Sequence, residues 1–256
     1  DIMNRLESLL KVLSLDYKPD KASNLALGMG ILQLGRYREQ IAEHLSSGLN
    51  PDRPHRGLIF LAGLYHDAGK FSSQSMDERG KIKFTGHEQI GSSLAEKRGQ
   101  ALKLSNLEIT RLVTIVCHHM RPSLLSHTVE LPSKKAIYRF FRDTGAAGVD
   151  ICILSLADIL ATYGPTLSQE RWSKHLEVVR ILLNAWWEKR EAQVLPSSMV
   201  NGEDLMNELG LVPGPIIGYM LESIREAQVA GDIHNKEDAI NYARMILAEN
   251  INKKTG

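Results

Sequence analysis

Apolar residues recur along most of the chain every three or four positions, the spacing that places side chains on one face of an α-helix. Two of the clearest stripes are Met3, Leu6, Leu10 and Leu13, and, within a helix predicted over 168–194, Trp172, Leu176, Val179, Leu183 and Trp186. Alternating strand patterns are scarce, and residues 81–84 predict at most one arm of a small hairpin. The pattern therefore predicts an all-α fold.

Signals for helix ends support this reading. Ser105 and Glu108 have the spacing of a capping box, in which each side chain accepts a hydrogen bond from the other residue's backbone N–H. The helix that they open is expected to end near position 119, because Pro122 cannot continue it. Residues 149–163 are nearly all apolar, so we expect a buried central helix that Gly164 closes.

A turn-rich break at residues 195–202 predicts a domain boundary. We therefore expect a helical bundle over residues 1–195 and a small helical tail domain over 196–256. The tail pattern predicts helices near 204–209, 215–230 and 235–249.

Charge and composition limit the possible partners. The 256 residues contain 31 Lys and Arg against 30 Asp and Glu, so any site for RNA must be a local patch. The two cysteines, Cys117 and Cys152, lie in apolar helical patterns, which argues against a disulfide framework and for a reducing, cytoplasmic location. Gly, His or Asp interrupts the longest apolar runs, so we expect no membrane span. Because the chain opens at Asp1, we expect it to be part of a longer protein.

Several histidines and aspartates occupy helix ends or a buried helix, which is how an α-helical bundle brings distant ligands together. They are His66, Asp67, His87, His118, His119 and Asp158. Imidazole and carboxylate together suit Zn, Fe, Mn, Ni or Co, and a carboxylate in an apolar helix such as Asp158 is costly unless it is paired. The alternatives are helix-end pairs without a ligand role and, for Asp158, a hydrogen bond from Ser155 or Thr162.

One stretch identifies a family resemblance. The sequence LAGLYHDAGK at 61–70 resembles the signature of the HD superfamily of metal-dependent phosphohydrolases, whose ordered pattern is H…HD…D on an all-α bundle. FTGHEQIGS at 84–92 and VCHHMRP at 116–122 resemble the extra histidine motifs of members that bind two metal ions, and LADILAT at 156–162 resembles the terminal Asp motif. The match extends over about residues 20–165.

A second resemblance narrows the subfamily. LKLSNLE at 102–108, VNGEDL at 200–205 and LGLVPGPIIG at 209–218 are similar to the HD-containing C-terminal half of bacterial CCA-adding enzymes and poly(A)-polymerase-like proteins. In those proteins this part contributes to holding RNA, which implies tRNA or another RNA as a partner. The chain lacks the Gly-Gly-Ser/Thr stretch and paired carboxylates of a nucleotidyltransferase head, so we expect no nucleotide addition by this chain alone.

The resemblances imply a site with one or two divalent transition-metal ions (Mn, Ni, Fe, Co or Zn). One position would use His66, Asp67 and Asp158, and the other would use Asp67, His87, His118 and His119. Asp67, shared by both, and Lys70 would be the catalytic residues.

The implied substrate is a nucleotide, a cyclic phosphate or an RNA end. Lys70 and Arg121 would contact its phosphate, although a solvated lysine and a surface arginine are the plain alternatives. The first His of the family pattern is not evident. Asn24, a weak ligand, occupies its expected place. The alternative function is therefore a non-catalytic RNA-binding scaffold whose metal site is vestigial or structural.

Overall fold

The computed structural model describes residues 1–18 and 24–255, and the side chains up to residue 249. Helices dominate these residues, as the periodicity predicts. The paired strands among them are β1 (Ser75–Met76) and β2 (Ile82–Lys83), which form one antiparallel hairpin. The all-α prediction is confirmed, and so is the predicted hairpin arm.

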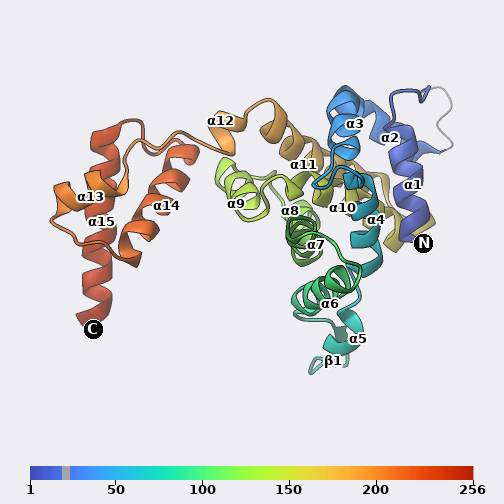
Figure 1. Ribbon diagram of the computed structural model, residues 1–256, viewed down its shortest axis with the longest axis horizontal. Coiled ribbons are helices and arrows are strands. Elements are labelled where there is room, and N and C mark those ends of the chain that lie inside the picture. Colours follow the sequence, from blue (N-terminus) through green and yellow to red (C-terminus); the bar gives the residue numbers. More distant parts are fainter. Residues whose placement is uncertain (19–23, 256) are drawn as a thin grey trace. The chain divides into compact units, whose positions relative to one another are not determined.

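The chain divides into two compact units, residues 1–131 with 144–187 and residues 132–143 with 188–256. Figure 1 labels the elements of both. The first unit contains, besides the hairpin, α1 (Ile2–Val12), α2 (Leu25–Leu34), η2 (Gly35–Tyr37), α3 (Arg38–Ser46), α4 (His55–Tyr65), α5 (Lys70–Ser73), α6 (His87–Ala101), α7 (Asn106–His118), α8 (Arg121–His127), α10 (Ala147–Tyr163), η3 (Gly164–Thr166) and α11 (Gln169–Trp187).

The centre of the first unit is α10, which packs against α1, α4, α7, α8 and α11. Its residues are buried along almost the whole helix. Gly164 closes it with a φ of 48°, a conformation that residues with a Cβ rarely adopt. The buried central helix and its glycine end are as predicted.

The same segment bears on the expectation that the chain has no membrane span. Residues 147–166 are long and apolar enough to cross a membrane, with a mean hydropathy of 1.5 over the best window. However, 72% of that window is buried inside the structure, as in the core helix of a globular unit. The absence of a membrane partner stays a prediction.

Helices α6 and α7 form an antiparallel pair joined by a short loop, so the start of α6 lies near the end of α7. The predicted capping box begins α7: Glu108 N–H donates to Ser105 Oγ at 3.3 Å, and Ser105 N–H donates to Glu108 Oε2 at 2.7 Å. The helix ends at His118, one residue short of the predicted end, and Pro122 lies in the first turn of α8.

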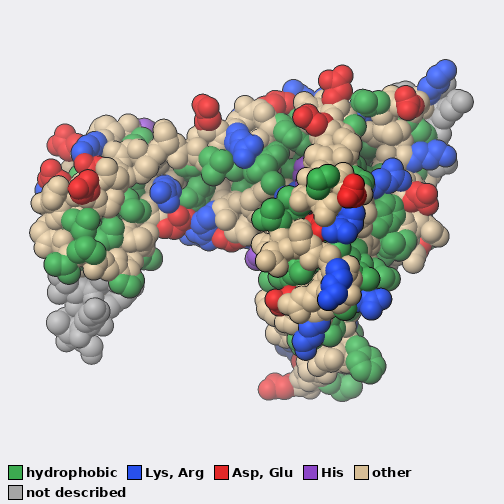
Figure 2. Space-filling model, viewed as in Figure 1, with side chains coloured by type: hydrophobic (Ala, Val, Ile, Leu, Met, Phe, Trp, Pro, Cys, Tyr) green, Lys and Arg blue, Asp and Glu red, His purple; other side chains and the backbone are tan. Residues whose placement is uncertain are grey.

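The hairpin lies outside the core. Around α5 and β1, hydrophobic side chains reach the surface (Figure 2). Phe71 is 94% exposed and Met76 is 70% exposed. This arm therefore adds little to the burial that stabilises the fold.

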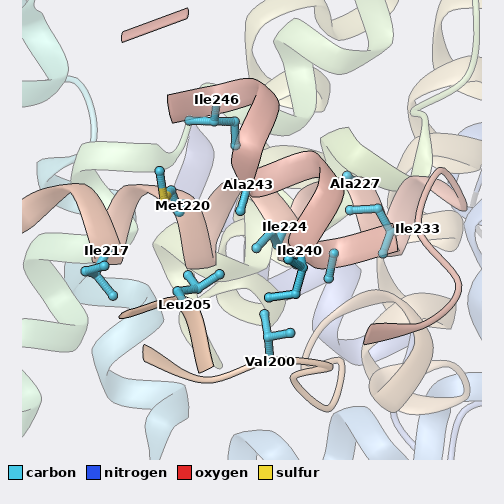
Figure 3. Packing of buried hydrophobic residues seen from close by; sticks show 11 residues of the cluster. Val200, Leu205, Ile217, Met220, Ile224, Ala227, Ile233, Ile240, Ala243 and Ile246 are labelled. Carbon is cyan, nitrogen blue, oxygen red and sulfur yellow. The ribbon is translucent and has the colours of Figure 1, made fainter. Parts of the chain in front are cut away.

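The second unit has its own core. Its helices are α9 (Lys134–Thr144), α12 (Arg190–Gln193), α13 (Gly202–Leu209), α14 (Pro215–Ala230) and α15 (Lys236–Thr255). Side chains from α13, α14 and α15 pack together, among them Leu205, Ile217, Met220, Ile224 and Ile240 (Figure 3).

The units differ from the predicted ranges at two places. Helix α11 ends at Trp187 and a separate short helix follows, where the sequence predicted one helix to 194. Helix α9 is grouped with the helices of the second unit, and Arg139 of α9 donates two hydrogen bonds, of 2.7 and 2.6 Å, to Glu226 of α14. The domain boundary at 195 stays a prediction.

Candidate metal centre

Three histidines of the first unit are held in the same way. His66, His87 and His119 each place Nδ1 at 2.7–2.8 Å from the backbone carbonyl three residues earlier, namely those of Gly63, Phe84 and Val116. A carbonyl oxygen only accepts, so Nδ1 carries the proton in each ring. This bond fixes the orientation of each ring and leaves Nε2 as the nitrogen that can bind a metal ion. Metal-binding histidines in proteins usually donate their other ring N–H to a carbonyl or carboxylate in the same way.

Asp67 lies where the Nε2 atoms meet. Its Oδ1 is 3.6 Å from Nε2 of His87 and 3.8 Å from Nε2 of His119. Both Nε2 atoms are buried and have no hydrogen-bond partner. The ligand atoms of Asp67, His87 and His119 all lie within 4.8 Å of one another. This spacing allows a single ion to contact all three.

The other oxygen of Asp67 has different neighbours. Lys70 Nζ donates to Oδ2 at 2.6 Å, and His66 Nε2 lies 3.3 Å from it. Burial raises the pKa of Asp67, but the hydrogen bonds and positive charges of His66 and Lys70 outweigh burial and hold that pKa below its usual value. The two oxygens therefore face two different environments.

Asp158 approaches from α10. Its Oδ1 is 3.6 Å from His66 Nε2 and accepts a hydrogen bond of 3.3 Å from Thr162. Burial lowers the pKa of His66, but the neighbouring carboxylates of Asp158 and Asp67 outweigh burial and raise that pKa to about 9. The predicted hydroxyl partner and a charged partner are thus both present at Asp158.

His119 differs from His66 in its proton affinity. Its pKa is lowered, first by burial and then by the charge of His66. Its ring stacks edge-on against both neighbours, with centroids 5.2 Å from His66 and 5.3 Å from His87. A neutral, desolvated imidazole is the form that binds a metal ion.

Other predicted residues lie elsewhere. His118 is the half-buried last residue of α7, and it is not in the cluster of Asp67, His87 and His119 found among the described residues. Arg121 is the partly exposed first residue of α8. The ligand role of His118 and the phosphate role of Arg121 stay predictions. Asn24 caps α2, with its Oδ1 accepting from Leu27 N–H at 3.0 Å, so this oxygen already has a partner.

The sequence did not single out Glu88. Its Oε2 lies 3.2 Å from Nδ1 of His87, which places a carboxylate beside the proton of that ring. An acidic residue directly after a candidate histidine in the first turn of a helix was the available signal.

The donor set fits a first-row divalent metal. It combines imidazole nitrogens with a carboxylate oxygen. Nε2 of His87 and of His119 are desolvated without compensation from the protein, which is costly unless another partner completes them. An ion held by Asp67, His87 and His119, with His66 and Asp158 adjacent, would supply that partner.

Comparison with known proteins places this cluster in a family. A model of the HD domain matches residues 32–163, which is more than half of the chain and includes all five converging residues. The chain belongs to the HD domain family. His66 and Asp67 are the dipeptide of the HD signature that the sequence pointed to. A model of tRNA nucleotidyltransferase domain 2 matches residues 174–243, from α11 into the tail helices.

Two relatives of this HD protein have names that describe them as tRNA nucleotidyltransferases. An A-adding tRNA nucleotidyltransferase from Deinococcus radiodurans is 30% identical over 219 residues, covering 83% of this chain and 48% of the relative. A CC-adding tRNA nucleotidyltransferase from Thermus thermophilus is 30% identical over 223 residues, covering 84% of this chain and 47% of the relative. The chain spans about half the length of these curated relatives.

Proposed function

We propose that this chain is a metal-dependent phosphohydrolase that acts on a nucleotide, a cyclic phosphate or an RNA end. The observation that carries the proposal is the pair of buried Nε2 atoms, of His87 and His119, that face Asp67 without a hydrogen-bond partner. A site built only to stabilise the fold would pair these atoms within the protein.

The residues have distinct roles in this proposal. Asp67, His87 and His119 hold the ion, and His66 and Asp158 complete its surroundings. A bound divalent ion supplies Lewis acidity and lowers the pKa of a coordinated water. Lys70 has a side chain that is 39% exposed while its Nζ contacts Asp67. It can therefore reach a phosphate oxygen without leaving the site, and it neutralises phosphate charge.

We further propose that the chain is the HD-containing part of a cytoplasmic protein related to tRNA nucleotidyltransferases, with tRNA or another RNA as its partner. The names of the relatives and the match over residues 174–243 support this proposal. We expect the RNA contact on the second unit. Lys135, Arg139 and Arg142 of α9 are poorly suited to it, because they pair with Glu222 and Glu226.

The test combines metal content with hydrolysis. The protein is purified without added metal, reconstituted in turn with Mn²⁺, Ni²⁺, Fe²⁺, Co²⁺ and Zn²⁺, and assayed on bis(p-nitrophenyl) phosphate and a 2′,3′-cyclic nucleotide. We expect metal-dependent hydrolysis that falls about 100-fold or more in Asp67→Ala, because this change removes the carboxylate that faces both histidines. His234→Ala, which removes an exposed histidine of the second unit, is the matched control.

The outcomes separate the two functions. Metal binding without hydrolysis of any phosphoester would support the alternative, an RNA-binding scaffold with a structural metal site. A wild-type protein that retains none of the five ions, and an Asp67→Ala variant that melts at the wild-type temperature, would refute metal binding altogether.

A further inference from the structure

We infer that Gly69 is a positioning residue: the missing side chain lets the 66–69 turn pack directly on the first turn of α6 and so brings His87 to Asp67. The inference rests on the proposed metal site. Gly69 has φ −71° and ψ −16°, ordinary helical values that any residue adopts. A requirement for glycine here therefore comes from space and not from backbone conformation.

The space at Gly69 is filled by backbone. A Cβ built on this residue would lie 2.0 Å from the carbonyl oxygen of His87, 2.9 Å from its carbonyl carbon and 2.7 Å from the amide nitrogen of Gly91. These atoms belong to the helical backbone of α6 and cannot rotate away as a side chain can. Since non-bonded heavy atoms pack at about 3.5–4.0 Å, the first turn of α6 would have to retreat by about 1 Å or more.

The retreat would act on a metal ligand. His87 is the first residue of α6, and its own carbonyl is the atom that a Cβ at Gly69 strikes first. Its Nε2 lies 3.6 Å from Asp67 Oδ1, and Asp67 lies in the same turn as Gly69. Metal–ligand distances tolerate only about 0.2 Å, and functional sites tolerate about 0.5 Å. A displacement of about 1 Å would therefore take His87 out of the ligand set.

Gly91 forms the other side of the same contact. A Cβ on Gly91 would lie 3.5 Å from the amide nitrogen of Gly69, 3.4 Å from the carbonyl oxygen of Tyr65 and 3.3 Å from Cγ1 of Val116. The first two of these distances are ordinary contacts for a Cβ, and the third requires the Val116 side chain to shift by a few tenths of an ångström. Substitution at Gly91 therefore pushes on α7 through Val116 and leaves the contact with Gly69 nearly unchanged.

The test compares the Co²⁺ affinity and the visible Co²⁺ spectrum of two glycine variants with those of the wild type, measured well below their melting temperatures. We expect Gly69→Ala to weaken Co²⁺ binding about 10–100-fold, the usual effect of losing the support of a ligand, and to alter the spectrum. Gly57→Ala, which adds a methyl where nothing lies within 4 Å, is the matched control and should stay within about twofold.

A double-mutant cycle separates positioning from general loss of stability. Because Gly69 acts through His87, Gly69→Ala should have no further effect on Co²⁺ affinity in a His87→Ala background. A Gly69→Ala protein with a lower melting temperature but wild-type affinity would overturn the inference, and so would additive effects in the cycle.

The remaining outcomes are decided in advance. If Gly69→Ala does not fold in buffer, its Co²⁺ affinity is measured in trimethylamine N-oxide, which favours the folded state. Wild-type affinity there would overturn the inference. If the wild type binds no Co²⁺, the proposed function fails, and the role of Gly69 at a metal site fails with it. If the wild type binds Co²⁺ and the glycine variants bind equally well, only the role of Gly69 is refuted.

Discussion

Asp150 and Asp158 are two carboxylates of the same helix, α10, with opposite surroundings. Asp150 is 1% exposed, accepts from Arg111 Nε at 2.5 Å, and lies 2.8 Å from His44 Nε2. Its charge is thus compensated by a fixed guanidinium, which ties α10 to α7 and α3. Within the described part of the chain, Asp158 pairs with no guanidinium; its side chain lies 3.6 Å from His66 Nε2 and accepts from Thr162. One aspartate is therefore tied into the fold, and the other faces the candidate metal centre.

We predict that substitution separates these two roles. Asp150→Ala should lower the free energy of unfolding by about 3–5 kcal/mol, because it leaves the charge of Arg111 buried without its partner. It should leave Co²⁺ affinity unchanged in the folded protein. Asp158→Ala should weaken Co²⁺ binding with a smaller loss of stability. Urea unfolding and metal competition measure both, and equal effects of the two variants on affinity would contradict the assignment.

His175 carries a pH dependence of its own. It is fully buried between Ser126 and Ser155, with ring nitrogens 3.2 and 3.1 Å from their hydroxyl oxygens. Burial lowers its pKa to about 4. As the pH falls below the usual histidine pKa of about 6.5, the unfolded chain takes up this proton and the folded protein does not. The stability that neutral His175 contributes is therefore present above this range and declines as the pH falls toward 4.

The expected loss is about 3 kcal/mol between pH 7 and pH 4, since one pKa unit corresponds to about 1.4 kcal/mol. Urea midpoints at pH 7, 5.5 and 4.5 would measure it. His175→Gln, which keeps a polar side chain without a titrating group, should show a flatter dependence over that range. Parallel curves for the two proteins would refute this source of the pH dependence.

At the scale of elements, the start of α7 depends on one side chain that has two tasks. Glu108 closes the capping box with Ser105 and also accepts two hydrogen bonds from Arg53, at 2.7 and 2.8 Å. The bond from Arg53 is the main reason that the pKa of Glu108 falls to about 2, with burial opposing it. The carboxylate therefore stabilises the fold above the usual glutamate pKa, and that contribution is lost as the pH falls from about 4.5 to 2.

We predict that Ser105→Ala costs about 1 kcal/mol of stability, the usual value for an N-cap, and that Glu108→Ala costs more. The glutamate change breaks the cap and also removes the partner of Arg53. Thermal melts at pH 7 compare the two variants, with Glu203→Ala, which removes an exposed glutamate from the first turn of α13, as a surface control. Equal losses for Ser105→Ala and Glu108→Ala would show that the Arg53 contact contributes nothing.

Local signals predicted those elements whose ends are encoded nearby. Ser105 with Glu108 begins α7, and Gly164 ends α10, as the sequence indicated. The approach of His66, Asp67, His87, His119 and Asp158 also follows from the order of the motifs. The pairing of Arg139 with Glu226 and the fit of Gly69 against α6 depend on residues far apart or on backbone packing, which periodicity does not report. The sequence predicted both His118 and His119 as ligands, and helix rotation at the end of α7, which spacing does not report, places His119 in the cluster with Asp67 and His87.

At the scale of the whole molecule, each of the two units has its own hydrophobic core, and the candidate metal centre lies in the first unit. The residues that converge on Asp67 all belong to the first unit, whereas the cluster around Leu205 is built from the second unit alone. A metal ion that binds only the folded first unit would stabilise that unit by linkage, by about 2.7 kcal/mol at 100 times its Kd. The second unit has no ligand among the converging residues and should not respond.

This separation predicts the effect of weakening one core at a time. Leu205 is fully buried, so Leu205→Ala should cost the second unit about 2–5 kcal/mol while Co²⁺ affinity stays at the wild-type value. Leu112 of α7 is equally buried, and Leu112→Ala should instead lower the temperature of the unfolding transition that Co²⁺ raises. Calorimetry with and without Co²⁺ assigns each transition to its unit. The contrary outcome is a single unfolding transition whose temperature Co²⁺ raises as a whole and both variants lower equally. It would show that the two cores unfold together and that their stabilities are coupled through the chain.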